Sequence, residues 1–160
     1  MYNIGDKVVY PMHGAGIITG KEEREILGEK KEYYILRMPI NKMNLMIPIE
    51  NIDELGIRSV MTVEEMDEVL DILKSHEEID IPKNWNRRYR FNLERIKTGN
   101  IIEIARVVRC LERLDDVKTL STGERKMLTS AKQIIISEMV LVYDKDIDEI
   151  TELIEKLVLE

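Results

Sequence analysis

The sequence has little of the chemistry that disulfides, metal sites and membrane spans require. Its single cysteine, Cys110, cannot form a disulfide within the chain, and its two histidines, His13 and His76, are too far apart for a Cys/His zinc site. No apolar run approaches the roughly 20 residues of a membrane-spanning helix, and the N-terminus lacks the features of a signal peptide. We therefore expect a cytoplasmic protein with no metal centre and no cofactor.

Signatures of an enzyme are also missing. The segments GEKK (28–31) and GERK (123–126) lack the spacing of a phosphate-binding loop. His13 has no serine, cysteine or carboxylate at a spacing that would complete a catalytic site. The sequence therefore predicts a protein that acts by binding and not by catalysis.

Negative charge dominates the chain but is unevenly distributed. The formal net charge of the 160 residues is -7, yet residues 83–113 hold nine Lys/Arg against three Asp/Glu, a net charge of +6. Residues 61–82 (net -7) and 114–160 (net -5) enclose this basic block. A basic stripe between acidic flanks is typical of a surface that binds and positions a polyanion. From charge alone, a solvated helix face explains the block equally well.

Residues up to about 56 have the pattern of short strands. Runs of β-branched and aromatic residues alternate with glycine and proline turn signals. The runs lie at 7–10, 16–20, 22–26, 32–38 and 44–49. GEKK (28–31) is the expected hairpin turn between the third and fourth runs. Five short strands in under 60 residues predict a small β-barrel of the SH3 or Tudor type.

From Thr62 onward the apolar period is that of helices. Thr62 with Glu65, and Ser121 with Glu124, have the spacing of helix capping boxes. We expect five helices, which begin near residues 62, 85, 101, 121 and 146. The predicted fold is therefore α+β: a small Tudor/SH3-like β-barrel domain of residues 1–58, followed by an all-α domain of residues 59–160.

The basic block falls on two of these helices. In the helix expected over 85–97, Leu93 and Ile96 share the core stripe, whereas Arg87 and Arg90 lie on the opposite side. The next helix carries three arginines on a face separate from its apolar stripe: Arg106, Arg109 and Arg113. Both helices are therefore expected to offer a basic face.

The only tryptophan of the chain, Trp85, stands at the entrance to the basic block, next to Asn84, a good helix N-cap. One interpretation is a hydrophobic staple that packs against the start of the helix. The other is a minor-groove wedge, in which neighbouring arginines hold phosphates while the flat side chain enters a partly unstacked base step.

Four blocks of sequence, in this order, carry a family resemblance. They are IGDKVVYPMHGAGII (4–18), NWNRRYRFNLERIKTGN (84–100), IARVVRCL (104–111) and LSTGERKML (120–128). Together they resemble the CarD/CdnL family of bacterial RNA polymerase-binding transcription regulators, over nearly the whole chain. The resemblance implies a Tudor-like barrel that binds the RNA polymerase β subunit and a helical domain that contacts promoter DNA. It also implies a nucleoid-associated location through RNA polymerase.

The resemblance assigns DNA-binding roles within the second block. Trp85 matches the family tryptophan that wedges into the minor groove at the upstream edge of the transcription bubble and so stabilises the open promoter complex. Arg87, Arg88 and Arg90 match its basic neighbours.

The resemblance also assigns a polymerase-binding surface to the barrel. Arg24 matches a family arginine of that surface, whereas a second family arginine falls at Met46, so the sequence departs from the pattern there. A more apolar polymerase contact is the expected result. The alternative function is a protein-interaction or RNA-binding adaptor without promoter specificity, which predicts no preference for melted over intact duplex.

Overall fold

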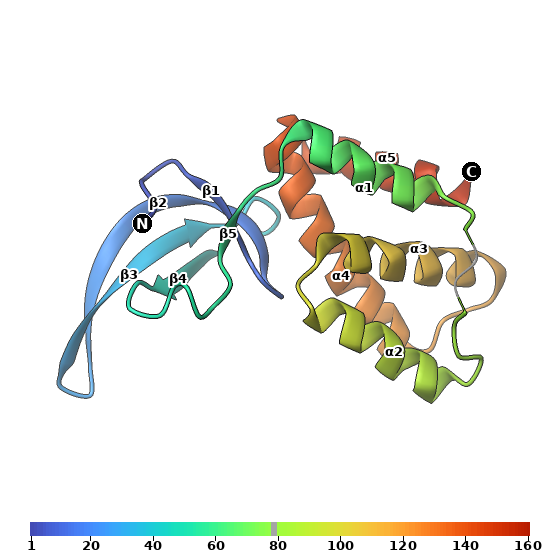
Figure 1. The fold of residues 1–160 in the computed structure, drawn as a ribbon, viewed down its shortest axis with the longest axis horizontal. Helices are drawn as coiled ribbons and strands as arrows, with labels where there is room; N and C mark the ends of the chain where they lie inside the picture. Colours follow the sequence, from blue (N-terminus) through green and yellow to red (C-terminus); the bar gives the residue numbers. More distant parts are fainter. Residues whose placement is uncertain (78–79) are drawn as a thin grey trace.

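A curved antiparallel sheet is followed by five helices in the computed structural model, which describes residues 1–77 and 80–160 (Figure 1). The strands are β1 (Lys7–Tyr10), β2 (Gly14–Ile26), β3 (Glu29–Arg37), β4 (Asn44–Pro48) and β5 (Arg58–Ser59), in the sheet order β4-β3-β2-β1-β5. The helices are α1 (Val63–Lys74), α2 (Trp85–Lys97), α3 (Ile101–Val117), α4 (Thr122–Tyr143) and α5 (Ile147–Leu159). The predicted α+β class is confirmed. Within the described residues, no helix has the length and apolarity that a bilayer crossing needs.

The sheet differs from the sequence prediction in two strands. Segments 16–20 and 22–26 belong to one long strand, β2, because its pairing with β3 continues past Gly20. The register shifts between Ile18 and Gly20, an irregularity that bends a strand without ending it. The fifth strand is β5, whose two residues pair with β1 and are too few to leave an alternating pattern.

The β2–β3 hairpin turns through two residues, Leu27 and Gly28, so the turn predicted over 28–31 is wrong beyond Gly28, because residues 29–31 already pair with β2. Both turn residues have positive φ angles, of 53° and 82°, as the tightest hairpin turns require. Beyond the sheet, the hairpin continues as a ribbon that projects away from the helices (Figure 1). This ribbon, residues 23–32, is called the hairpin arm below.

Local capping signals set the start of the helices. The Thr62 hydroxyl accepts a hydrogen bond from the Glu65 amide, while the Glu65 carboxylate accepts one from the Thr62 amide, so this capping box is confirmed. Ser121 accepts from the amide of Glu124, but the Glu124 carboxylate accepts from Arg88, so only half of this second predicted capping box is formed among the described residues. The α3 helix begins at Ile101, as expected, and ends at Val117.

Each part of the chain has its own apolar core. The sheet packs Val8, Ile18, Tyr34 and other side chains on its inner face. The helices bury a larger cluster, to which all five contribute, with Leu111 and Ile135 fully buried at its centre. Alternation along the strands directs apolar side chains into the sheet core, while the apolar stripes of the helices meet in the helical core.

An ion pair joins the sheet to the helices. Arg58 of β5 donates two hydrogen bonds to the carboxylate of Glu138 in α4, with N···O distances of 2.8 and 2.9 Å. The backbone amide of Met61 donates to the same carboxylate, and Glu138 is only 1% exposed. A buried carboxylate with three donors fixes the two parts in one relative position.

A close backbone approach completes the junction. The amide of Ala15 in β2 donates a hydrogen bond of 2.8 Å to the Ser137 hydroxyl of α4. Gly14 has a φ of 110°, and a Cβ atom there would lie 2.7 Å from the Ser137 hydroxyl oxygen. Only glycine therefore fits where β2 meets α4.

Candidate nucleic-acid interface

Trp85 is the first residue of α2, and its side chain is 53% exposed. Asn84 caps the helix, because its side-chain oxygen accepts hydrogen bonds from the amides of Asn86 and Arg87 at 3.0 and 3.3 Å. A hydrophobic staple precedes the cap and is packed, whereas Trp85 follows the cap and is half exposed. This position and exposure favour the wedge over the staple, because half of the indole is available to a partner.

Arg87 and Arg90 surround this entrance with unneutralised positive charge. Both are exposed, and among the described residues neither has a carboxylate within 4 Å. The first turn of α2 contains no acidic residue, unlike the first turns of α1, α3, α4 and α5. The positive end of the helix dipole adds to the arginine charges, so this end of α2 attracts anions.

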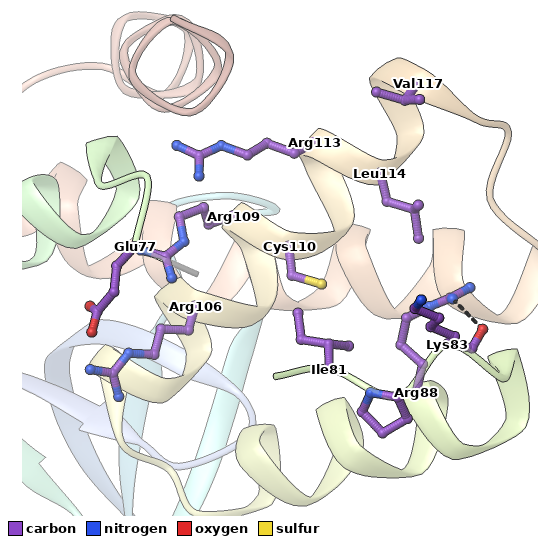
Figure 2. A pocket seen from close by; sticks show the side chains of 11 residues that line it. Glu77, Ile81, Lys83, Arg88, Arg106, Arg109, Cys110, Arg113, Leu114 and Val117 are labelled. Carbon is purple, nitrogen blue, oxygen red and sulfur yellow. Dashed lines mark hydrogen bonds between the residues drawn. The ribbon is translucent and has the colours of Figure 1, made fainter. Parts of the chain in front are cut away.

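Arg88 has a different environment from its two neighbours. Its Nε and Nη2 atoms donate to the carboxylate of Glu124 in α4 at 2.7 and 2.8 Å, and its Nη1 donates to the Lys83 carbonyl, the dashed line in Figure 2. Glu124 is 1% exposed. The bonds from Arg88 lower the pKa of the Glu124 carboxyl against the opposing effect of burial. Arg88 therefore ties the start of α2 to α4.

The arginines of α3 do not form the basic face that the sequence predicts. Arg109 is buried and donates to the Ile72 carbonyl at the end of α1. Arg113 donates to the carbonyls of Ser75, at 2.7 Å, and Val158 in α5, at 2.9 Å. These guanidinium groups bond to backbone carbonyls at the ends of α1 and α5, and so are structural. Arg106 pairs with Glu103 at 2.6 Å.

A pocket of about 450 Å³ lies between α3 and the segment before α2 (Figure 2). Cys110 and Leu114 line it from α3, opposite Ile81 and Pro82. Burial raises the pKa of the Cys110 thiol, which keeps the sulfur in its neutral, weakly nucleophilic form. Cys110 therefore contributes to packing at the wall of this pocket.

A shallow hollow of about 490 Å³ runs along the outer side of α2. Arg87, Arg90 and Phe91 line it, and the Arg95 guanidinium lies 4.2 Å from the centre of the Phe91 ring. Arg95 also approaches Glu103 at 3.5 Å, so its charge is partly compensated. The exposed cations thus border an apolar surface on the same helix as Trp85.

The two residues assigned to polymerase binding share one face of the sheet. Arg24 pairs with Lys31 across the hairpin, and Met46 of β4 pairs with Ile35. Successive side chains of a strand lie on alternate faces of the sheet. Both pairs therefore lie on the face opposite to the one that holds the buried Tyr34 side chain. This surface, made of Glu22, Arg24, Tyr33, Ile35, Met46 and Pro48, is called the outer face below. Arg24 is exposed there, and Met46 is half-buried.

Comparison with known families decides the identity of the chain. The model of the CarD C-terminal domain matches residues 68–155, and that of the CarD-like/TRCF RID domain matches residues 2–61. The chain belongs to the CarD/CdnL family. A Bacillus subtilis (strain 168) relative, named "Putative transcription factor YdeB", is 45% identical over 139 residues, which is 87% of this chain and 90% of the relative.

Two solved N-terminal domains of this family are also similar to the chain. CdnLNt from Myxococcus xanthus is 38% identical with a TM-score of 0.34, and the match covers 38% of this chain and 86% of that one. The 72-residue N-terminal domain of Myxococcus xanthus CarD, solved by NMR, is 25% identical with a TM-score of 0.33, over 37% and 79% of the two chains.

Proposed function

We propose that this CarD/CdnL protein is a transcription regulator that holds promoter DNA open at RNA polymerase. The outer face of the sheet binds the RNA polymerase β subunit, and the start of α2 binds promoter DNA. Trp85 enters the minor groove at the upstream edge of the transcription bubble. The observation that carries the proposal is the exposed indole on an acid-free helix start, beside two arginines that pair with no carboxylate in residues 1–77 and 80–160.

The four assigned DNA-binding residues divide into three roles. Trp85 is the wedge, since an apolar ring can fill a partly unstacked base step. Arg87 and Arg90 contact phosphates, because their charges are exposed and unneutralised. Arg88 positions these residues through Glu124. This assignment departs from the family resemblance, which counts all three arginines among the DNA contacts.

Arg24→Glu should weaken binding of the chain to RNA polymerase without changing the fold or the direct affinity for DNA. Arg24 lies on the exposed part of the outer face, 55% exposed and 3.4 Å from Glu22, so reversing its charge disturbs no buried contact. Binding to purified RNA polymerase, measured by biolayer interferometry, tests this, with Lys30→Glu on the other side of the hairpin arm as the control. Equal affinities of Arg24→Glu and wild type would show that the outer face is not the docking surface.

Arg87→Ala and Arg90→Ala should each reduce the salt dependence of DNA binding. If each arginine neutralises one phosphate, the slope of log affinity against log salt should lose about 0.9 per residue in duplex DNA. Titrations of the whole chain on promoter duplex at several salt concentrations give this slope. Unchanged slopes in both variants would exclude phosphate contacts by α2.

The wedge and the adaptor alternative predict different preferences between melted and intact DNA. A wedge prefers a fork or bubble, where a step is already unstacked, to an intact duplex. Competition of bubble and duplex DNA for the polymerase-bound chain separates the two functions. Equal binding of both forms would favour the adaptor.

A further inference from the structure

The shallow hollow on the outer side of α2 combines apolar surface with charged side chains, and is called the α2 hollow below. Its volume of about 490 Å³ is in the range of ligand sites, and most of its surface is apolar. In Figure 1, α2 lies at the edge of the helical part of the molecule. Three uncharged residues, Pro82, Phe91 and Thr98, contribute to the hollow. The charged residues that line it are Arg87, Arg90, Glu94, Arg95 and Glu103.

Phe91 and Arg95 form a stacking platform in this hollow. Phe91 is the only phenylalanine of the chain, and its half-buried ring lies outside the helical core of the described residues. The Arg95 guanidinium lies 4.2 Å from the centre of that ring. Aromatic rings and guanidinium planes are surfaces on which proteins stack unpaired nucleobases. The pair therefore has the chemistry of a nucleobase site.

The charges around the platform favour a base on Phe91 and phosphates beside it. Glu94 is exposed and lies within 4 Å of no cation among the described residues, so its carboxylate repels a phosphate placed in the hollow. Arg87 and Arg90 line the same hollow with unneutralised positive charge. A nucleotide strand therefore meets the two arginines with its backbone and the ring with a base.

The base that reaches this platform is an unpaired one. Bases inside a duplex are paired and stacked on their neighbours, so their faces are not available to Phe91. Phe91 follows Trp85 by six residues, which is about 9 Å along the helix axis, or roughly two to three base steps. When Trp85 fills the junction between duplex and bubble, Phe91 is at the distance of the first unpaired bases.

We propose that the α2 hollow binds an unpaired base of a melted promoter strand, about two to three positions from the junction that Trp85 fills. This inference rests on the proposed DNA contact of Trp85 and adds a separate contact to single-stranded DNA. A base stacked on Phe91 is not free to pair again. The hollow therefore opposes closure of the bubble from its single-stranded side, whereas the wedge acts where the duplex ends.

Phe91→Leu separates stacking from packing, because leucine keeps most of the apolar volume but has no aromatic face. The thermal midpoint should stay close to that of wild type, since Phe91 lies outside the helical core. The affinity for a fork, a duplex with one unpaired strand, should fall by about 5-fold or more, the lower end for loss of a base–aromatic stack. The affinity for intact duplex should not change.

Two further variants are the controls for Phe91→Leu. Phe91→Tyr keeps the ring and should bind the fork as wild type does. Val117→Ala shortens an 85% exposed apolar side chain on α3, away from the α2 hollow, and should also bind normally.

Fluorescence anisotropy of the whole chain on labelled forks at low salt gives these affinities. A second series of forks carries an abasic site at one unpaired position at a time. Wild type should lose affinity when the missing base is about two to three positions from the junction. Phe91→Leu should lose nothing further at that position, because the contact is already absent. Trp85→Ala should remain sensitive to it.

The outcomes separate the base site from the wedge. Wild-type fork affinity in Phe91→Leu, or no response of wild type to any abasic position, overturns the base site alone when Trp85→Ala still weakens fork binding. The abasic series on wild type decides the matter if Phe91→Leu lowers the thermal midpoint. An equal loss on fork and duplex in Phe91→Leu also overturns the base site. Equal affinity of wild type for fork and duplex overturns the wedge and the base site together.

Discussion

Trp85→Ala should shorten the lifetime of the open promoter complex while the protein stays folded and bound to RNA polymerase. The indole is 53% exposed and is not part of the described helical core, so its removal should leave that core intact. Loss of a ring that stacks at the edge of the bubble should cost about 1–3 kcal/mol, which is roughly a 5- to 150-fold faster closure. Trp85→Phe should recover part of the lifetime, since it keeps a smaller apolar ring.

Thermal unfolding and the decay of competitor-resistant promoter complexes, measured on the same preparations, test the wedge. The thermal midpoint of Trp85→Ala should stay close to that of wild type. A large fall in the midpoint would mean that the indole supports the helical core. A normal complex lifetime with normal polymerase binding would remove Trp85 from the DNA contact.

Arg88→Met should destabilise the helical part of the protein by about 3–5 kcal/mol, because it leaves the buried Glu124 carboxylate without its cation. Arg87→Met, one position away and exposed, should change stability by less than about 0.5 kcal/mol. Urea unfolding of the two variants gives the comparison. A double variant, Arg88→Met with Glu124→Leu, should recover much of the lost stability, since it removes both charges.

The effect of Arg88→Met should depend on pH in a defined direction. Arg88 lowers the pKa of Glu124 in the folded protein, so the stabilisation is present above the unfolded carboxyl pKa of about 4.3 and is lost as pH falls through the folded value. The stability gap between wild type and variant should therefore be widest near neutral pH and narrow below about pH 4. An Arg88→Met protein of normal stability with a reduced salt slope would instead place Arg88 on a phosphate.

Local signals in the sequence predicted most of the fold. A cap and its N3 partner lie within one helical turn, so Thr62 and Glu65 could be recognised without tertiary information. The apolar stripe of α2 likewise placed Leu93 and Ile96 toward the core. The two-residue strand β5 was missed because its pairing depends on β1, about 50 residues away in the sequence.

The buried charges could not be predicted in this way. The spacing of Glu124 from Ser121 is that of a capping box, which predicts an exposed residue at the start of a helix. Its carboxylate instead pairs with Arg88, 36 positions earlier in the sequence. Arg109 and Arg113 repeat at the spacing of a basic helix face, but their partners are carbonyls of other helices. Helical periodicity predicts which side of its own helix a side chain lies on. Whether its charge is exposed to solvent depends on a partner that is distant in the sequence, and periodicity does not identify that partner.

The α4 helix carries two buried glutamates, of which one anchors the start of α2 and the other anchors the sheet. Glu124 pairs with Arg88 of α2, and Glu138 pairs with Arg58 of the sheet. The two glutamates are 14 positions, or about 21 Å, apart along one continuous helix. In Figure 1 this helix runs from the start of α2 toward the sheet. Under the proposed function, α4 fixes the distance between the polymerase-binding sheet and the edge of the bubble. The base step that meets Trp85 is then selected by its distance from the polymerase surface and not by its sequence.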